Sequence, residues 1–314
     1  MKNAFPFRGV ALALLGFALF SMHDAIIKSL SGVHAFQIAF FVCLFSFVPV
    51  TFMLAIDGEE RSLRPRLPLL VGLRCLFTTG SLLSAFYAFG VLPLADVYAL
   101  LFAAPILITL LAIPVLGETV RLVRWVAILM GMSGVLVVLG PNIKSLSIGH
   151  ISALIAAICI ACSSIVTRKI GDREHSVTLI LYPMLCNIVV SGLLLLTVYV
   201  PLSLFDLGKL ALIGLISVVA QRLIITAYRA SEAQFIAPMQ YSQMLWAVIF
   251  GALVFQEPIS SQTLSGSAII ILSGIMFIWR ELQASARKPI LRTRNFRVAG
   301  GPQAVPGEID TANK

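Results

Sequence analysis

Apolar residues fill almost the whole chain in stretches of about 18 to 23 residues, which short polar segments separate. The stretches lie near residues 9–30, 35–56, 68–90, 95–117, 123–140, 148–170, 176–200, 207–229, 234–256 and 262–280. An α-helix needs about 20 apolar residues to cross the hydrocarbon core of a bilayer. The pattern therefore predicts an all-α integral membrane protein with ten transmembrane helices, joined by segments too short to fold as separate domains.

Composition also indicates that the bilayer, rather than water, is the solvent of this chain. Hydrophobic residues make up 59% and charged residues 12%, with a mean hydropathy of +0.98. The five cysteines all fall inside predicted spans, which argues against a disulfide framework. Cys159 and Cys162 have the spacing of a metal or redox motif but lack partner ligands. We interpret them as helix-packing residues and expect no metal site and no cofactor.

The distribution of Lys and Arg predicts the orientation of the chain. If the N-terminus is cytoplasmic, eighteen of these cations lie in cytoplasmic segments, and only Lys28, Lys144 and Lys209 lie on the other side. Because cytoplasmic loops carry an excess of Lys and Arg, we expect both termini in the cytoplasm of a bacterial inner membrane. The net charge of +9 then reflects orientation, not nucleic-acid binding. Residues 281–314 are polar, basic and proline-containing, which predicts a disordered cytoplasmic tail.

The spans predict two copies of a five-helix unit, at residues 8–140 and 148–280. The ends of the first span of each copy align in register, Ser21–Lys28 with Cys162–Lys169. An odd number of helices per copy places the two copies in opposite orientations in the membrane. Inverted repeats of this kind are typical of transporters that alternate access around a central site.

A lone glutamate ends the fourth span of each copy, Glu118 in the first and Glu257 in the second. Arg121 and Arg124 follow Glu118, whereas no cation follows Glu257 before the next span, as expected for loops on opposite faces. We interpret the two glutamates as helix-packing or gate residues.

Several segments resemble the drug/metabolite transporter superfamily, of the kind with two EamA-type domains, over about residues 8–280. These segments are Leu92–Pro105, Leu116–Glu118, Gly131–Val135, Ala237–Trp246 and Phe255–Pro258. The run from Tyr241 to Pro258 is similar to the branch that includes riboflavin and S-adenosylmethionine uptake carriers. Two positions depart from the pattern, because Met244 stands opposite Pro105 and Gln256 replaces a glycine.

The resemblance implies secondary transport through a central cavity lined by spans one, three, four, six, eight and nine. In agreement, the chain contains no G-x-x-x-x-G-K-[ST] loop for ATP. It also lacks the H-E-x-x-H and G-x-S-x-G motifs, so we expect no catalytic residues and no enzyme activity.

Ionisable groups inside spans cost roughly 2.5–3.5 kcal/mol each on insertion scales, so they invite a functional explanation. Asp24, late in the first span, is the first candidate for substrate binding or coupling. A carboxylate in low dielectric takes up a proton more readily than in water, so it can exchange one as access alternates. The alternative is a structural partner for a neighbouring helix. His23 is a second candidate, although it points about 100° away from Asp24 around the helix, or it is simply a packed histidine.

Arg74 and Arg222 lie at equivalent places in the third and eighth spans. A guanidinium can clamp an anionic or carbonyl-rich substrate through two parallel bonds. Alternatively, these side chains snorkel to the cytoplasmic interface about 9–10 Å away, or pair with a neighbouring helix.

Aromatic and amide side chains of the fourth and ninth spans are candidates for the specificity surface. They are Tyr98, Phe102, Gln240, Tyr241, Gln243 and Trp246. An apolar, aromatic cavity with a few amides suits a planar or heterocyclic metabolite. Ordinary packing and interfacial belting are the alternative.

The sequence thus predicts a secondary transporter of a small polar or heterocyclic metabolite. Uptake of riboflavin or a nucleoside-like cofactor is the sharper hypothesis, and export of amino acids, drugs or other metabolites is the alternative. The expected partners are a small-molecule substrate and the lipid bilayer, with a homodimer left open and no nucleic acid.

Overall fold

In the computed structural model, the described residues are 7–30, 32–56, 64–117, 122–139, 147–170, 173–230, 236–257 and 260–286. Their regular structure is entirely helical. The elements are α1 (Phe7–Lys28), α2 (Ala35–Ile56), α3 (Pro68–Val91), α4 (Leu94–Leu101), α5 (Ala104–Leu116), α6 (Leu122–Leu139), α7 (Ile148–Ile170), α8 (Ser176–Val198), α9 (Leu204–Ala230), the 3-10 helix η2 (Ala237–Tyr241), α11 (Ser242–Val254) and α12 (Ser261–Ala286).

Seven stretches of these helices are long and apolar enough to cross a membrane. They are Phe7–Ser29, Ala35–Phe52, Pro68–Val91, Leu94–Leu116, Ile148–Ile170, Val177–Val198 and Leu204–Tyr228. Shorter apolar stretches lie at Leu129–Val138 and Met239–Val254. The all-helical, multi-pass character is therefore confirmed, and the count of ten spans stays a prediction. Helix α12 continues to Ala286, six residues beyond the predicted end of its span at 280, and the rest of the predicted tail lies outside the described residues.

The predicted fourth and ninth spans are each interrupted. Helix α4 ends at Leu101, and α5 begins at Ala104 with Pro105 in its first turn. Proline lacks an N–H and its ring clashes with the carbonyl four residues earlier, which kinks or breaks a helix, and here the break lies just before Pro105. In the ninth span, the 3-10 turn η2 gives way to α11 at Ser242. Counted from Glu118 and Glu257, the two interruptions fall at equivalent positions.

The ends of these two spans also share an unusual backbone conformation. Gly117 has φ 67° and Gln256 has φ 52°, the only two positive φ values among the described residues. A left-handed residue commonly ends an α-helix, and glycine adopts it without a steric penalty. The second half therefore keeps the same helix end although glutamine has replaced glycine there.

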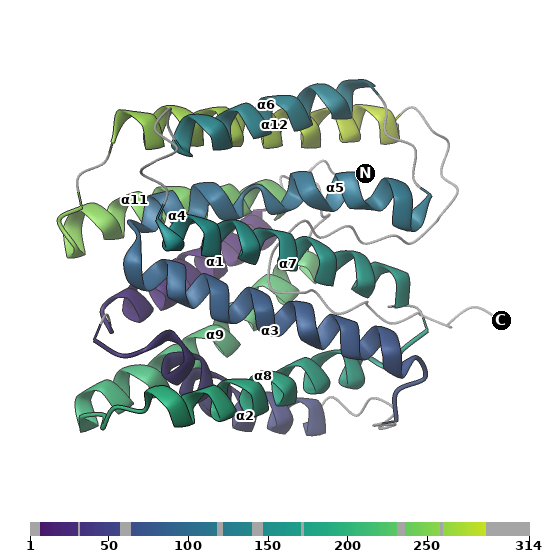
Figure 1. Ribbon diagram of the computed structural model, residues 1–314. Coiled ribbons are helices and arrows are strands. Elements are labelled where there is room, and N and C mark those ends of the chain that lie inside the picture. Colours follow the sequence, from purple (N-terminus) through teal and green to yellow (C-terminus); the bar gives the residue numbers. More distant parts are fainter. Residues whose placement is uncertain are drawn as a thin grey trace.

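Helices at corresponding places in the two halves pack in a reciprocal way (Figure 1). Helix α3 packs on α7 as α1 packs on α9, and α3 packs on α8 as α9 packs on α2. The equivalent pairs α2 with α8, α4 with α11, and α6 with α12 pack directly on each other. The bundle is thus built from two similar units that pack through a shared interface.

Helices α6 and α12 form a pair along one edge of the bundle, where small residues set their separation (Figure 1). A Cβ placed on Gly134 would lie 2.8 Å from the Gly266 carbonyl oxygen, and one on Gly266 would lie 2.6 Å from that of Gly134. Close backbone approach through small residues is a main source of helix association in lipid. Both glycines are therefore contact points between α6 and α12.

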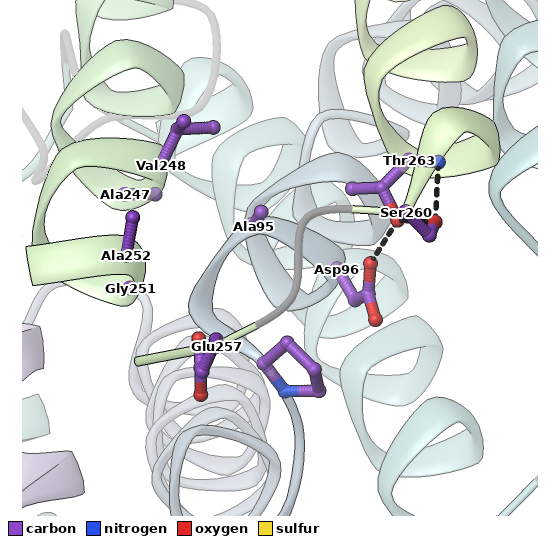
Figure 2. A pocket seen from close by; sticks show the side chains of 10 residues that line it. Ala95, Asp96, Ala247, Val248, Gly251, Ala252, Glu257, Ser260 and Thr263 are labelled. Carbon is purple, nitrogen blue, oxygen red and sulfur yellow. Dashed lines mark hydrogen bonds between the residues drawn. The ribbon is translucent and has the colours of Figure 1, made fainter. Parts of the chain in front are cut away.

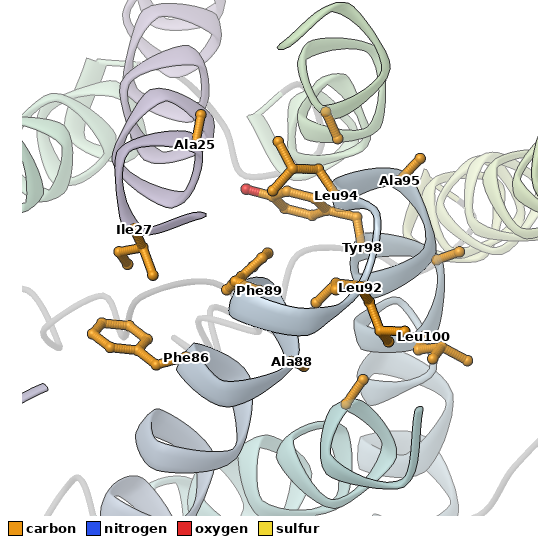
Figure 3. Packing of buried hydrophobic residues seen from close by; sticks show 14 of the residues in the cluster. Ala25, Ile27, Phe86, Ala88, Phe89, Leu92, Leu94, Ala95, Tyr98 and Leu100 are labelled. Carbon is orange, nitrogen blue, oxygen red and sulfur yellow. The ribbon is translucent and has the colours of Figure 1, made fainter. Parts of the chain in front are cut away.

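The largest buried apolar cluster surrounds the turn between α3 and α4 (Figure 3). Leu94 and Leu100 are fully buried there, and Phe86 and Phe89 extend from α3 toward Ala25 and Ile27 of α1. Because lipid is as apolar as these side chains, the cluster stabilises the bundle by close packing rather than by removal from water. It fixes the position of α4, which carries Tyr98.

Candidate functional site

A hydrogen-bonded cluster joins the C-terminal half of α1 to α4. Tyr98 donates its hydroxyl proton to Asp24 Oδ2, and its oxygen lies 3.4 Å from Ser21 Oγ. His23 Nδ1 lies 2.7 Å from Asp24 Oδ1. Ser21, His23 and Tyr98 are buried. The carboxylate of Asp24 therefore has a partner on each oxygen, which is what a charge removed from water requires.

The Tyr98 ring lies between Leu94 and Phe89, with its hydroxyl directed toward α1 (Figure 3). Its position follows from the break at Pro93, after which α4 begins at Leu94 and packs against α11 and α7, while Tyr98 reaches Asp24 of α1. Tyr98 and Asp24 are separate candidates in the sequence. The structure brings them into contact.

His23 does not point away from Asp24 in the way that the helical geometry predicts. Its imidazole turns back to hydrogen-bond the neighbouring carboxylate, while Phe20 and Phe86 contact it edge-on with centroid distances of 6.3 and 6.1 Å. Among the described residues, Asp24 is the polar partner of His23, and aromatic rings flank the imidazole. The two side chains thus form one hydrogen-bonded pair.

A row of aromatic rings leads from α3 through α4 to the second interrupted span. The ring centroids of Phe89 and Tyr98 are 5.7 Å apart, those of Tyr98 and Phe102 are 6.2 Å apart, and those of Phe102 and Tyr241 are 5.3 Å apart. Gln243 of α11 also lies beside the Tyr98 hydroxyl. Asp24, Tyr98, Phe102, Tyr241 and Gln243 therefore lie together.

Phe102 and Tyr241 occupy equivalent positions in the two halves, each at the interruption of its span. Their rings are in contact, so the two interruptions meet. Interrupted helices expose backbone groups and side chains at membrane depth, which is where carriers build their substrate sites. The row of rings therefore marks the best candidate for such a site.

Trp246 and Gln240 lie on the same segment but extend the cluster less directly. Trp246 stacks on Phe250 with a centroid distance of 6.1 Å, and both side chains are half-buried. Gln240 lies in η2, beside Tyr241. Their predicted part in the specificity surface stays a prediction.

Arg74 is not brought to Asp24. Its side chain is 4% exposed, and it donates from Nε to Thr167 Oγ1 at 2.8 Å and from a terminal nitrogen to the Leu179 carbonyl. These bonds tie α3 to α7 and α8, which favours the helix-pairing interpretation over a substrate clamp. Arg222 is half-buried on α9, and its role stays a prediction.

The two glutamates are described unequally. Glu118 lies outside the described residues. Glu257 forms an ion pair with Lys28, with 2.5 Å between Oε1 and Nζ, and its Oε2 accepts from the N–H of Leu94 at 3.1 Å. Glu257 also lines a small pocket between α4, α11 and α12, together with Asp96 and Thr263 (Figure 2). This pocket lies at the N-terminal end of α4, not at Asp24.

Three polar residues that the sequence did not single out as site candidates have defined roles. Ser21 is a partner of Tyr98, and its position three residues before Asp24 is the only signal that could have indicated it. Glu174, 8% exposed, accepts hydrogen bonds from the N–H groups of Arg66 and Leu67 just before α3. Lys28 appeared only as a loop cation in the charge count, yet it pairs with Glu257.

A bundle of apolar helices with two interrupted spans that meet at a polar and aromatic cluster is the architecture of a membrane carrier. Comparison with known proteins identifies the family. The chain belongs to the EamA-like transporter family, which matches residues 7–140 and 147–280. It is therefore a membrane transporter with two EamA-like repeats, as the resemblance implied.

Relatives with known names carry different substrates. The chain is 25% identical to an S-adenosylmethionine uptake transporter of Rickettsia bellii, over 89% of this chain and 96% of that protein. It is 26% identical to the pseudopaline exporter CntI of Pseudomonas aeruginosa, over 85% and 94%. A riboflavin transporter of Rhizobium johnstonii is 29% identical over 63% of this chain and 65% of that protein.

One solved structure, titled only as the crystal structure of a protein, shares the fold. Its TM-score is 0.59 with 17% identity, and the alignment covers 89% of this chain and 98% of that chain. At this identity the likeness concerns the architecture alone.

Proposed function

We propose that this protein is a secondary transporter that moves a small heterocyclic metabolite across the bacterial inner membrane by alternating access. The observation that carries the proposal is the cluster of Asp24, Tyr98 and Gln243 beside the contact of Phe102 with Tyr241. It combines a buried carboxylate, an amide and aromatic faces where the two repeats meet.

The proposed topology is ten transmembrane helices in two inverted repeats, residues 8–140 and 148–280, with both termini cytoplasmic. The reciprocal packing and the contact between the two equivalent interruptions support this arrangement. In an inverted pair, one repeat can adopt the conformation of the other, which exchanges the face to which the site is open.

The sharper proposal is uptake of a nucleoside-like cofactor. Aromatic faces stack on planar heterocycles, and amide groups hydrogen-bond their edges. Relatives named for S-adenosylmethionine uptake match nearly their full length, and riboflavin transporters match a shorter part. Asp24 would pair with a positively charged or proton-donating group of the substrate in exchange for its bonds to His23 and Tyr98.

Export is the second candidate, and a specific observation favours it. A pseudopaline exporter is as similar to this chain as the uptake transporters are, over nearly the same length. Alternating access is reversible, so the substrate and coupling gradients set the direction of flux. We propose that the unit of Asp24 and His23 exchanges the coupling proton in either direction.

The first test is a thermal-shift screen of the purified full-length protein in detergent with S-adenosylmethionine, riboflavin, nucleosides and amino acids. A ligand that binds only the folded state raises the melting temperature, because it stabilises that state. At a hundred times its Kd, the stabilisation is about 2.7 kcal/mol. A shift with a heterocycle that is lost in Asp24→Asn but kept in the control Asp206→Asn supports the proposal. Asp206 is a partly exposed carboxylate paired with Lys209 at the start of α9.

The stabilising compound is then tested for flux in sealed vesicles prepared in both orientations. Accumulation that follows an imposed proton gradient supports coupled uptake, and extrusion in the same assay supports export. A shift that persists unchanged in Asp24→Asn would refute the assignment of Asp24 to the site.

A further inference from the structure

Two charged side chains, one from each repeat, hydrogen-bond to the backbone of the turn between α3 and α4. Pro93 separates the helices, so the carbonyl of Leu92 and the N–H of Leu94 have no partner within either helix. Lys28 Nζ donates to the Leu92 carbonyl, and Glu257 Oε2 accepts from Leu94 N–H at 3.1 Å. The two side chains also pair with each other, with 2.5 Å between Nζ and Oε1.

The pair is largely withdrawn from water. The side chains of Lys28 and Glu257 are 13% and 15% exposed, and the ammonium lies 5.6 Å from the ring centroid of Phe255. Two charges in such a place stay together strongly, because separating them without water leaves each one unpaired. When water enters, both charges can be hydrated, so water access lowers the cost of separating them.

The backbone holds Glu257 folded back toward α11. Its N–H donates to the Gly251 carbonyl at 3.0 Å, and the left-handed Gln256 reverses the chain before it. A Cβ on Gly251 would lie 2.9 Å from Glu257 Oε2, so an alanine there pushes the end of the Glu257 side chain from its present place. Asp96 cannot take over the role of Glu257, because it points toward α12 and accepts from Thr263 at 2.5 Å (Figure 2).

The pair lies one helical turn from the candidate substrate site on two helices at once. Lys28 follows Asp24 by four residues on α1, and Tyr98 follows Leu94 by four residues on α4. Residues four apart lie on the same face of a helix, about 6 Å along the axis. A shift of α1 against α4 at the site therefore displaces the charged pair as well.

We propose that Lys28, Glu257 and the turn Leu92–Leu94 form a latch that closes the face of the bundle at which α1 ends. The latch opens when the carrier exposes its site to that face. This inference rests on the alternating access proposed above, and the orientation predicted from charge makes this face the outer one. Because Lys28 belongs to the first repeat and Glu257 to the second, a relative motion of the repeats breaks the pair.

The test measures water access beneath the latch and needs no substrate. Ala247, 1% exposed, lines the pocket one turn before Gly251 on α11 and serves as a cysteine reporter. Intact cells that express the full-length Ala247→Cys protein are treated with a membrane-impermeant maleimide, with the protein lacking the reporter as background. We expect Lys28→Met and Glu257→Gln each to raise the labelling rate by about tenfold or more, which corresponds to about 1.4 kcal/mol of lost preference for the closed state.

Two further variants separate latch opening from general unfolding. Gly251→Ala keeps both charges but displaces Glu257, so it should also raise the labelling rate. Lys209→Met removes the partly exposed pair of Lys209 with Asp206, 3.8 Å apart, and should leave the rate unchanged. Melting temperatures in detergent identify any variant that has lost its fold. If a charge variant is unfolded, the labelling rate of Gly251→Ala tests the latch instead.

Unchanged labelling in Glu257→Gln and Gly251→Ala, at native melting temperatures, would overturn the latch. The latch would also be overturned if Lys209→Met raised the labelling rate as much as the charge variants do. Neither result affects the ligand-induced thermal shift, so failure of the latch and failure of the proposed function are told apart.

Discussion

Replacing Tyr98 by phenylalanine tests the central cluster most directly. The change removes one hydroxyl and keeps the ring that packs against Phe89 and Phe102. The lost bond to Asp24 is the important one, because the contact with Ser21 at 3.4 Å is long and contributes little. The effect on stability therefore reports the strength of a single buried interaction.

The expected magnitude depends on the charge of Asp24. A hydrogen bond to a charged group contributes about 1.5–3 kcal/mol net, whereas hydrogen bonds between membrane helices average about 0.6 kcal/mol. His23 can supply a second donor to the other oxygen of Asp24, 2.7 Å away, which supports the ionised carboxylate. We therefore expect Tyr98→Phe to lower the free energy of unfolding by about 1.5–3 kcal/mol.

A double-mutant cycle with Asp24→Asn isolates this interaction. Asparagine retains an acceptor but no charge, so Tyr98→Phe should cost only about 0.6 kcal/mol in that background. The coupling energy is then about 1–2 kcal/mol. It is measured by equilibrium unfolding of the purified protein in mixed micelles, with tryptophan fluorescence as the signal.

Tyr87→Phe is the matched control. Tyr87 lies on α3 against the same apolar cluster, and it is not one of the partners that the described residues provide for Asp24. If Tyr98→Phe costs the same in both backgrounds to within about 0.5 kcal/mol, the two residues are energetically independent and the proposed site loses its main contact.

Three further substitutions test other parts of the structure. Arg74→Met should lower the free energy of unfolding by about 1–3 kcal/mol through lost hydrogen bonds between helices, while the apparent KM for transport stays unchanged. A raised KM would support the interpretation of Arg74 as a substrate clamp. Gly134→Leu should force α6 from α12 and cost about 1–3 kcal/mol in a thermal melt, whereas Gly72→Leu, with nothing within 4 Å of its Cβ, should cost little. Gln256→Gly should raise the melting temperature. Relief of the left-handed glutamine stabilises the folded state by about 1–2 kcal/mol, and the greater entropy that glycine loses on folding offsets about 0.5–1 kcal/mol of this gain. A lower melting temperature would refute strain at this residue.

The helical character and the repeats could be predicted because the bilayer imposes a simple length rule on apolar stretches. The interruptions could not be located as well, since the sequence from Leu94 to Leu116 has the length and hydropathy of a single span. In the first half Pro105 weakens the helix, because it lacks an N–H. In the second half Met244 stands in place of this proline, and Pro238 lies in η2, four residues before the junction at Ser242.

Site residues were predictable one at a time, but their partners were not. The free-energy cost of an ionisable side chain inside the membrane indicated Asp24 and Arg74 equally, because that argument considers each residue alone. The structure separates them: Asp24 meets side chains of α4, and Arg74 is tied to α7 and α8. Lys28 was missed for the opposite reason. At a span end it looked hydrated, and only tertiary packing shows that Glu257 reaches it.

The two repeats are alike in backbone and unlike in the side chains of the site. The register of the first spans places Ile165 opposite Asp24, and the equivalent of Tyr98 is Ala237. A carrier with two identical halves would offer its substrate two equivalent orientations. Here the shared frame supplies the interrupted helices and the contact of Phe102 with Tyr241, which a symmetric exchange between two access states requires. The single carboxylate of Asp24 then lets a substrate with one matching polar group bind in only one orientation, so specificity resides in the departures from symmetry.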